Sequence, residues 1–391
     1  MNANIIKNSR AGKSGIILAL VCLILISGIL AGCSSGAVYR GWSGVAVDGD
    51  NLYIASLSSK LIGLDANNRN KLFNDIPLTV STAGSFFSSC SNSSSSSMYL
   101  YGTPCIGNNM IFVTTFAGKV FAYDTEKAIQ QWSYPEKGTL GSIVGGVFYY
   151  NGKVFFGTND GKVYALNAAA TGQLSPAAAW SSPFATREKI WSTPTASGET
   201  LFIGSFDKNM YAINISDGTE KWHFQTEGAI INTPIIKDGV VYFGSFDRYF
   251  YAVNAQTGQL VWKSQEPAGK WFWANPVLVG STIYAPNIDG KIYTFDISNG
   301  NMTTMDISAS PISSSPVLIG SQLIVAAENG KVWSIDTTKN SFKMLIDYQK
   351  KVYAPLSARQ NIIYAITVDN NIHALNTESG LDLWGPVALG N

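Results

Sequence analysis

The chain has 391 residues, and its 27 Lys and Arg residues nearly balance its 26 Asp and Glu residues, for a formal charge of +1. This balance argues against a nucleic-acid-binding protein, which carries a concentrated excess of basic residues. Charged residues make up only 14% of the chain, 46% are hydrophobic and 12% aromatic, whereas an ordinary soluble domain has about 25% charged residues. A chain this rich in apolar side chains can build a large core, so disorder is excluded for most of its length.

The first 33 residues have the features of a bacterial lipoprotein signal peptide. Three basic residues precede a 16-residue apolar run at residues 15–30: Lys7, Arg10 and Lys13. The run is shorter than the about 20 residues that a membrane-spanning helix needs, and the Leu-Ala-Gly-Cys sequence ending at Cys33 matches a lipobox. We therefore expect a signal peptide at residues 1–32, lipidation of Cys33, and an anchor and short linker at residues 33–41. The lipid would tether the exported protein to the periplasmic face of an outer membrane, or to the cell surface in a host with one membrane.

A unit of about forty residues repeats between residues 42 and 391. Residues 193–222 and 233–262 show it clearly, because both contain Thr-Pro, Gly-Ser-Phe-Asp, Tyr-Ala and Trp in the same order. One position, usually proline, marks the phase of eight copies: Val45, Pro104, Gly146, Pro194, Pro234, Pro276, Pro316 and Pro355. Each copy contains four short stretches typical of β-strands, separated by turn dipeptides such as Asp238-Gly239. Connections this short make each sheet antiparallel.

A four-stranded sheet of this size cannot bury both of its faces alone, whereas eight sheets arranged radially bury the faces between them. The sequence therefore predicts an all-β fold, an eight-bladed β-propeller over residues 42–391. The outer strand of each blade would pack against a neighbouring blade through one residue: Phe73, Trp132, Trp180, Trp222, Trp262, Thr304, Met344 and Trp384. Blades six and seven lack an aromatic ring there, so we expect looser packing. We expect Leu381–Trp384 to be the outer strand of blade eight, and blades one and eight to close the ring by face packing without strand exchange.

A Ser-rich insertion interrupts the repeats near residues 74–100 and is too polar to join a core. It contains Cys90, and Cys105 follows it. In an exported protein these two cysteines predict a disulfide, which would close a loop of about 15 residues and contribute on the order of 3 kcal/mol. Two free thiols are the alternative.

The repeat resembles that of the pyrroloquinoline-quinone (PQQ) type β-propellers in its recurring spacing of Ala, Gly and Trp: Ala212, Gly218 and Trp222; Ala252, Gly258 and Trp262. One branch of that family, the quinoprotein dehydrogenases, implies PQQ held between a Trp and a disulfide of adjacent cysteines, Ca²⁺ held by carboxylate and amide groups, and an Asp base. No two cysteines are adjacent here. The other branch, the BamB family of outer-membrane assembly lipoproteins, is the closer likeness. It implies eight blades, a lipid anchor, protein binding and no cofactor.

We therefore expect a non-catalytic, lipid-anchored scaffold that binds envelope proteins or peptides as a monomeric propeller, without cofactor or metal. The alternatives are a PQQ-dependent dehydrogenase and a carbohydrate-binding surface module. Only two histidines occur, which excludes a multi-histidine metal site; we expect His373 to pack in the core and His223 to be exposed. Four repeated aspartates are expected to serve hairpin turns rather than a metal: Asp207, Asp247, Asp289 and Asp369.

The candidate binding site comes from the position three residues before the phase residue. These residues open the innermost strands and would surround one mouth of the channel: Trp42, Tyr101, Ile143, Trp191, Ile231, Trp273, Ser313 and Val352. The BamB resemblance adds the loop before repeat four, where Lys189 lies near the basic contact of the family, whereas the acidic contact expected in residues 227–232 is missing. Aromatic and Arg-bearing rims are common binding hot spots. The hypothesis is a partner-binding face with these members: Trp42, Tyr101, Arg187, Lys189, Trp191, Trp271 and Trp273. Packing between blades is the alternative role for the rings.

Overall fold

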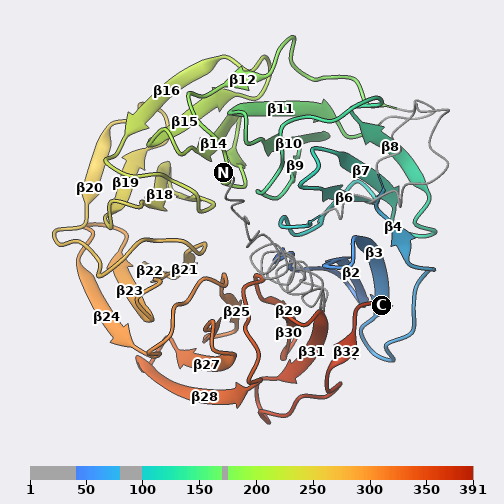
Figure 1. The fold of residues 1–391 in the computed structure, drawn as a ribbon. Coiled ribbons are helices and arrows are strands. Elements are labelled where there is room, and N and C mark those ends of the chain that lie inside the picture. The colour runs from blue at the N-terminus through green and yellow to red at the C-terminus, as the bar shows by residue number, and fades with distance from the viewer. Residues whose placement is uncertain (1–40, 80–98, 170–174, 391) are drawn as a thin grey trace, which may run out of the picture. The chain divides into compact units, whose positions relative to one another are not determined.

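The computed structural model describes residues 41–79, 99–169 and 175–390, and these residues belong to one compact unit. Its strands build eight antiparallel four-stranded sheets that follow one another around a ring, from blade one in blue to blade eight in red (Figure 1). In each sheet the strand order follows the chain. The predicted all-β, eight-bladed β-propeller is confirmed. Within the described residues, no helix has the length and apolar character needed to cross a membrane.

The thirty-two strands divide evenly among the blades. Blades one and two contain β1 (Val45–Asp48), β2 (Asn51–Ser56), β3 (Lys60–Asp65), β4 (Ile76–Pro77), β5 (Cys105–Gly107), β6 (Met110–Thr114), β7 (Val120–Asp124) and β8 (Gln130–Tyr134). Blades three and four contain β9 (Phe148–Tyr150), β10 (Lys153–Gly157), β11 (Lys162–Asn167), β12 (Phe184–Ala185), β13 (Thr195–Ser197), β14 (Thr200–Gly204), β15 (Asn209–Asn214) and β16 (Glu220–Gln225). Blades five and six contain β17 (Ile235–Lys237), β18 (Val240–Gly244), β19 (Phe250–Asn254), β20 (Leu260–Lys263), β21 (Val277–Val279), β22 (Thr282–Pro286), β23 (Lys291–Asp296) and β24 (Met302–Asp306). Blades seven and eight contain β25 (Val317–Ile319), β26 (Gln322–Ala326), β27 (Lys331–Asp336), β28 (Ser341–Asp347), β29 (Ser357–Arg359), β30 (Ile362–Thr367), β31 (Asn371–Asn376) and β32 (Val387–Ala388).

The hydrophobic core lies between the blades. Successive side chains of a strand point to opposite faces of its sheet, and in β18 Val241 and Phe243 pack against blade four while Tyr242 packs against blade six. The same alternation gives an apolar cluster at each of the eight junctions between neighbouring blades in the described part of the chain. The second and third strands are therefore apolar on both faces, which is why the sequence shows short, nearly continuous apolar runs there.

Four tryptophans join blades two to six in succession through a hydrogen bond from the indole Nε1 to a carbonyl oxygen of the next blade. Trp132, Trp222 and Trp262 lie on outer strands, whereas Trp180 lies just before the outer strand β12. The pairs are Trp132 to Ala168 (2.9 Å), Trp180 to Ile215 (2.9 Å), Trp222 to Ala255 (3.0 Å) and Trp262 to Ile297 (2.9 Å). A glycine of the next repeat covers the ring: at Gly258, where φ is +71°, an added Cβ would lie 2.7 Å from Cδ2 of Trp222. The recurring Gly and Trp are thus the two halves of one contact between blades.

Blades six and seven have no such contact at the corresponding positions. Thr304 is exposed, and Met344 is 48% exposed, whereas Trp132 in blade two is 1% exposed. Facing blade seven, an added Cβ at Gly380 would meet only the Leu345 carbonyl oxygen, at 3.5 Å. The outer layer is open on these two blades, as the missing aromatic residues predict.

Blade eight is completed by its own last strand, but that strand is not Leu381–Trp384. Asp382 forms a single bridge with Leu375, the chain then bends at Gly385 with φ +61°, and pairing resumes in β32. Blades one and eight close the ring by packing face to face, with an apolar cluster drawn from both. The Arg359 guanidinium pairs with Asp50, and the Ser357 hydroxyl donates to the Val45 carbonyl. Among the described residues, closure therefore needs no strand exchange.

The insertion after blade one is narrower than residues 74–100. Ile76 and Pro77 form β4, and Leu78 and Leu100 are buried in the cluster between blades one and two, with 1% and 0% exposure. Apolar residues at both ends of the Ser-rich stretch thus return to the core. The signal peptide with Cys33 and the Ser-rich stretch with Cys90 lie outside the described residues.

Candidate functional site

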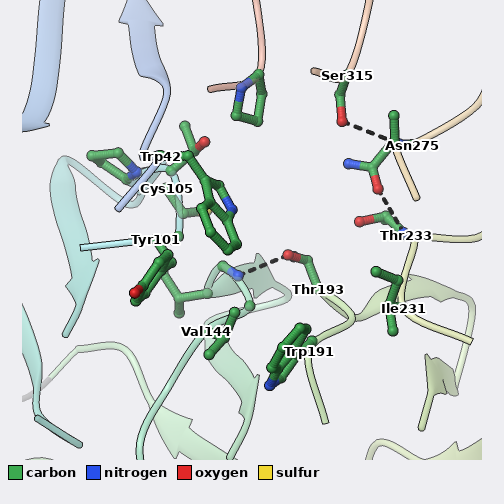
Figure 2. Close-up of a pocket in the computed structure, with 18 of the residues that line it drawn as sticks. Trp42, Tyr101, Cys105, Val144, Trp191, Thr193, Ile231, Thr233, Asn275 and Ser315 are labelled. Carbon is green, nitrogen blue, oxygen red and sulfur yellow. Dashed lines mark hydrogen bonds between the residues drawn. The ribbon is translucent and has the colours of Figure 1, made fainter. Parts of the chain in front are cut away.

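The innermost strands of all eight blades surround a central cavity of about 490 Å³. Two positions of each repeat supply most of its lining: the residue before the phase position and the residue three before it. Alternate residues of an extended chain point to the same side, so both side chains face the axis, as Figure 2 shows for Trp191 and Thr193 of one blade. The residue between them points away and bonds to the next blade, as Ser192 does to the Asn232 carbonyl at 3.0 Å.

In blades three and eight the predicted phase was wrong by one residue. Val144 and Tyr353 line the cavity, whereas Ile143 and Val352 are buried between blades, with 1% and 0% exposure. In blade eight the innermost strand starts two residues after Pro355 and not directly after it. In blade three two consecutive glycines precede the strand, and the sequence does not show which of them is the phase residue.

Polar side chains form a belt inside the cavity, which we call the hydroxyl ring: Thr103, Thr193, Thr233, Asn275 and Ser315. Four of these side chains accept a hydrogen bond from a backbone N–H group of a neighbouring blade, and Thr233 takes part through its own backbone N–H. Thr103 Oγ1 accepts from Gly44 at 3.1 Å, Thr193 Oγ1 from Gly146 at 2.8 Å, and Ser315 Oγ from Asn275 at 3.0 Å. Asn275 Oδ1 accepts from Thr233 at 2.8 Å, and Figure 2 shows the last three of these bonds. The hydroxyl ring therefore joins blades to one another and holds its own oxygen atoms in fixed positions.

Aromatic side chains surround the cavity, and we call them the aromatic collar: Trp42, Tyr101, Trp191, Trp273 and Tyr353. The Trp42 ring lies 4.4 Å from Tyr101 and 6.3 Å from Trp273, and Trp191 lies 6.1 Å from Trp273, all edge to face. The structure thus brings together four of the predicted binding residues and adds Tyr353. These rings touch one another across the axis, so they are more than separate fillers of the wedges between blades.

A second group of rings continues the collar over blades four to six, and we call it the outer aromatic row: Phe206, Phe246 and Trp271. Ring centroids lie 4.8 Å apart for Trp191 and Phe206, 6.0 Å for Phe206 and Phe246, and 5.0 Å for Phe246 and Trp271. The Trp271 side chain is 47% exposed. Sequence reasoning missed the two phenylalanines, although the duplicated Gly-Ser-Phe-Asp motif marks both.

A second cavity of about 370 Å³ shares four lining residues with the first: Trp42, Trp273, Ser313 and Tyr353. The shared residues show that the two spaces adjoin. Trp271, Ile288 and Pro311 make much of its remaining wall apolar, and Lys270 and Glu328 add one charge of each sign. Together the two cavities run from the exposed Trp271 to the propeller axis.

The two basic residues of the predicted face lie at its edge. Lys189 Nζ lies 4.2 Å from the Phe206 ring centroid and 4.9 Å from that of Trp191, so the ammonium group covers the outer aromatic row. Arg187 is exposed and lines neither cavity. Its backbone N–H donates to Asp207 Oδ2 at 2.9 Å. Lys189 therefore joins the predicted cluster, whereas Arg187 lies beside it.

The repeated aspartates serve their own hairpins. The hydroxyl groups of Tyr211, Tyr251 and Tyr293 each donate at 2.7 Å to the aspartate four residues earlier. Burial and the neighbouring carboxylate raise the pKa of Tyr293 to about 12. Asp207, Asp247 and Asp289 also accept a hydrogen bond from the backbone N–H two residues later, at 3.0–3.1 Å. In the described part of the chain no three His, Cys, Asp or Glu side chains converge as metal ligands would.

The two histidines lie where the repeat pattern places them. His373 is 7% exposed, its Nδ1 lies 2.7 Å from Asp382 Oδ2, and its ring lies 4.1 Å from that of Tyr348. His223 has 54% of its side chain exposed and pairs with Glu220 at 2.6 Å. Neither residue lines the central cavity. Both therefore belong to the fold and not to the site.

Cys105 lines the central cavity, and no cysteine among the described residues pairs with it. Burial raises the pKa of this thiol. Its predicted partner Cys90 lies outside the described residues, so the disulfide remains a prediction.

The lining of the central cavity does not match the PQQ site of the quinoprotein branch. No Asp or Glu is among the described residues that line it, and its asparagine, Asn275, already uses its Oδ1 for a backbone N–H. Glu328 reaches the second cavity as a single carboxylate. A Ca²⁺ ion requires six to eight oxygen ligands, usually with several carboxylates among them. The residues present therefore do not fit the PQQ–calcium pair.

Comparison with solved structures supports the same architecture. The structure of BamB from Moraxella catarrhalis superposes with a TM-score of 0.67 and 18% sequence identity, over 84% of this chain and 94% of that one. A computationally designed protein, Ika8, superposes with a TM-score of 0.62 and 17% identity, over 72% of this chain and 84% of that one. At these identities the likeness concerns the fold alone.

Among curated proteins, the similarity is confined to a short segment. The dehydrogenase subunit of a quinone-type alcohol dehydrogenase from Gluconobacter oxydans is 40% identical over 81 residues, which are 19% of this chain and 11% of that protein. The subunit from Komagataeibacter europaeus is 36% identical over the same length. The matched segment thus spans only about a tenth of these relatives.

A family model covers nearly the whole propeller. The model described as "Outer membrane protein assembly factor BamB" matches residues 34–188 and 169–386. Since these two matches take in all eight blades, and the fold agrees with that of a BamB structure, the chain belongs to the BamB family of PQQ-like repeat propellers.

Proposed function

We propose that this protein is a non-catalytic, lipid-anchored scaffold of the cell envelope that holds a partner protein on its aromatic face and thereby assists envelope protein assembly. The proposal rests on one observation: a chain of ring contacts links the aromatic collar to the outer aromatic row and ends at the exposed Trp271. Family membership supports the assembly role, and the lipobox at Cys33 supports the tether.

The chemistry of the face suits a protein partner. Trp271 is 47% exposed and stacks on Phe246, so one large ring is held rigidly while its surface faces solvent. Lys189 adds a cation that packs on Phe206 and Trp191. Rigid aromatic anchors beside a basic group are the side chains that most often dominate protein interfaces.

Photo-crosslinking in membranes tests the binding face. A photoreactive residue at position 271 should crosslink a component or client of the outer-membrane assembly machinery, identified by mass spectrometry. In the double variant Trp271→Ala plus Lys189→Ala the photoreactive residue is moved to position 246. The crosslinked yield should then fall at least about tenfold, because removing a hot-spot residue weakens the free energy of binding by about 2 kcal/mol or more.

Leu260 supplies the matched control, since it is 51% exposed on the outer strand of blade five. Crosslinks from position 260 that match those from position 271, or an undiminished yield in the double variant, would refute this binding face. The tether is tested separately: Cys33→Ala should abolish incorporation of a labelled fatty acid and release the protein from the membrane fraction.

A further inference from the structure

We infer that the central cavity binds a neutral saccharide, with one sugar ring inside the hydroxyl ring and a second able to lie against Trp271. The saccharide site shares Trp271 and part of the aromatic collar with the proposed partner-binding face. The inference is nevertheless tested separately, because sugar binding is measured on the isolated protein and partner binding in membranes. It is carried by the charge, the hydrogen-bonding capacity and the aromatic walls of the cavity.

The lining of the cavity selects against charged ligands. Within the described part of the chain, none of the residues around the 490 Å³ space is Lys, Arg, His, Asp or Glu. A charged group enclosed without a partner loses its hydration and gains nothing in return. Phosphate, carboxylate and ammonium groups therefore fit poorly, and a neutral ligand that forms hydrogen bonds through hydroxyl groups fits well.

Hydrogen-bonding capacity remains on several sides of this space. Thr103, Thr193 and Ser315 each accept one backbone N–H, and none of the three donates its own hydroxyl proton to another described residue. A hydroxyl that accepts one bond can still donate one and accept another. These groups stand on blades two, four and seven, around one point, whereas a peptide strand presents its polar groups in a line. A compact ligand with hydroxyls around its periphery matches this arrangement.

Ser313 adds one more hydroxyl to the wall of both cavities. Its oxygen has no hydrogen-bond partner among the described residues and is enclosed, so a ligand reaches it once the side chain rotates toward the cavity. An enclosed hydroxyl without a partner costs about 1–3 kcal/mol, so native proteins rarely leave one unused. The neighbouring Ser314 is the opposite case, because its hydroxyl donates to the Ala354 carbonyl at 2.6 Å, away from the cavity.

The aromatic collar supplies the other half of sugar recognition. The face of an aromatic ring is electron-rich, and the C–H groups on one side of a sugar ring pack against such a face while its hydroxyls point outward to polar partners. Trp42, Trp273 and Tyr353 line both cavities, so a chain of sugar rings can pass from the hydroxyl ring toward Trp271 without leaving aromatic contact.

Calorimetric titration of the full-length lipoprotein tests the inference, in a polyoxyethylene detergent that contains no sugar. The probes are cellobiose, maltotriose and the N-acetylglucosamine disaccharide, with glucosamine as a charged control and an uncharged capped tripeptide as a competing ligand class. At least one neutral saccharide should bind with a Kd below about 1 mM and change the tryptophan emission, whereas glucosamine and the tripeptide should not.

The adjacent serines form the matched pair of variants. Ser313→Ala should weaken saccharide binding about fivefold, the value of one ordinary hydrogen bond, and should raise the Tm of the ligand-free protein by about 2 °C, because an enclosed hydroxyl without a partner is removed. Ser314→Ala should lower Tm and leave the Kd unchanged. The inference is overturned if no neutral saccharide binds below about 1 mM, if the tripeptide binds more tightly than every sugar, or if Ser313→Ala binds as the unmodified protein does.

Discussion

Replacing Trp222 with alanine should destabilise the propeller several times more than the corresponding change in blade seven. Trp222 is 9% exposed, packs in the cluster between blades four and five, and donates its indole N–H to the Ala255 carbonyl at 3.0 Å. Met344 holds the same repeat position in blade seven, with 48% exposure and no such partner in the described residues. The two substitutions therefore compare, at the same position of the repeat, a blade junction covered by a buried indole with a junction that lacks this contact.

The magnitudes follow from what each side chain buries. Removal of a buried Trp costs about 3–5 kcal/mol, including the cavity that it leaves, whereas truncating a half-exposed Met costs about 1 kcal/mol or less. The unfolding entropy is about 2.1 cal/mol/K per residue, or roughly 0.7 kcal/mol/K for a unit of this size. Trp222→Ala should thus lower Tm by about 5 °C and Met344→Ala by about 1 °C.

Differential scanning calorimetry and urea unfolding measure both effects. Trp222→Phe separates the contributions, because it keeps a ring but removes the donor to Ala255, and it should lower Tm by about 2 °C. Equal losses in Trp222→Ala and Met344→Ala would show that the indole contacts do not hold neighbouring blades together.

Three further predictions follow from single groups. Gly258→Ala should lower the unfolding free energy by more than about 2 kcal/mol, because φ is +71° and the new Cβ would lie 2.7 Å from the Trp222 indole. Gly239→Ala is the control: φ is +76° but no atom lies near the new Cβ, so it should cost only about 1 kcal/mol. Urea titration measures both changes. The unfolding free energy should fall as pH rises from 10 toward 12, because the pKa of Tyr293 is about 12 in the folded protein and about 10 in the unfolded chain. Tyr293→Phe should make this fall less steep. An unchanged slope in the variant would contradict the role of Tyr293. In the reduced protein, Cys105 should react with iodoacetamide more slowly at pH 8 than an exposed cysteine does, because it lines the cavity and burial raises its thiol pKa. Mass spectrometry measures the two rates. Equal rates would show that the Cys105 thiol is not buried.

The repeat made the fold predictable, because each copy is a four-stranded sheet with two apolar faces that it cannot bury alone. Gly258 and Trp222 belong to different repeats, and their regular spacing marked both positions, whereas only the structure shows that they contact one another. The predicted phase was wrong in blade three, where glycines replace the usual proline, and in blade eight, where the proline is shifted by one residue. Pro355 stands one position early, and so Tyr353, a member of the aromatic collar, was missed in favour of the buried Val352.

The site was less predictable than the fold because it depends on contacts between repeats. Sequence placed Trp42 and Trp273 at equivalent positions of two blades, but only the ring geometry shows that they lie 6.3 Å apart. Phe206 and Phe246 precede aspartates that were predicted to serve hairpin turns, and nothing in the local sequence indicates that the two rings reach the collar. The orphaned hydroxyl of Ser313 is likewise invisible in the sequence, since its neighbour Ser314 has the same side chain and a partner.

The pairing of each indole with a carbonyl on the following blade also bears on how such rings change in evolution. A single repeat carries an acceptor for the blade before it, such as Ala255, and a donor for the blade after it, such as Trp262. Exchanging one of the repeats of blades three to five for a copy of another therefore keeps each donor matched to an acceptor, whereas a point change at either group breaks the match with one neighbouring blade.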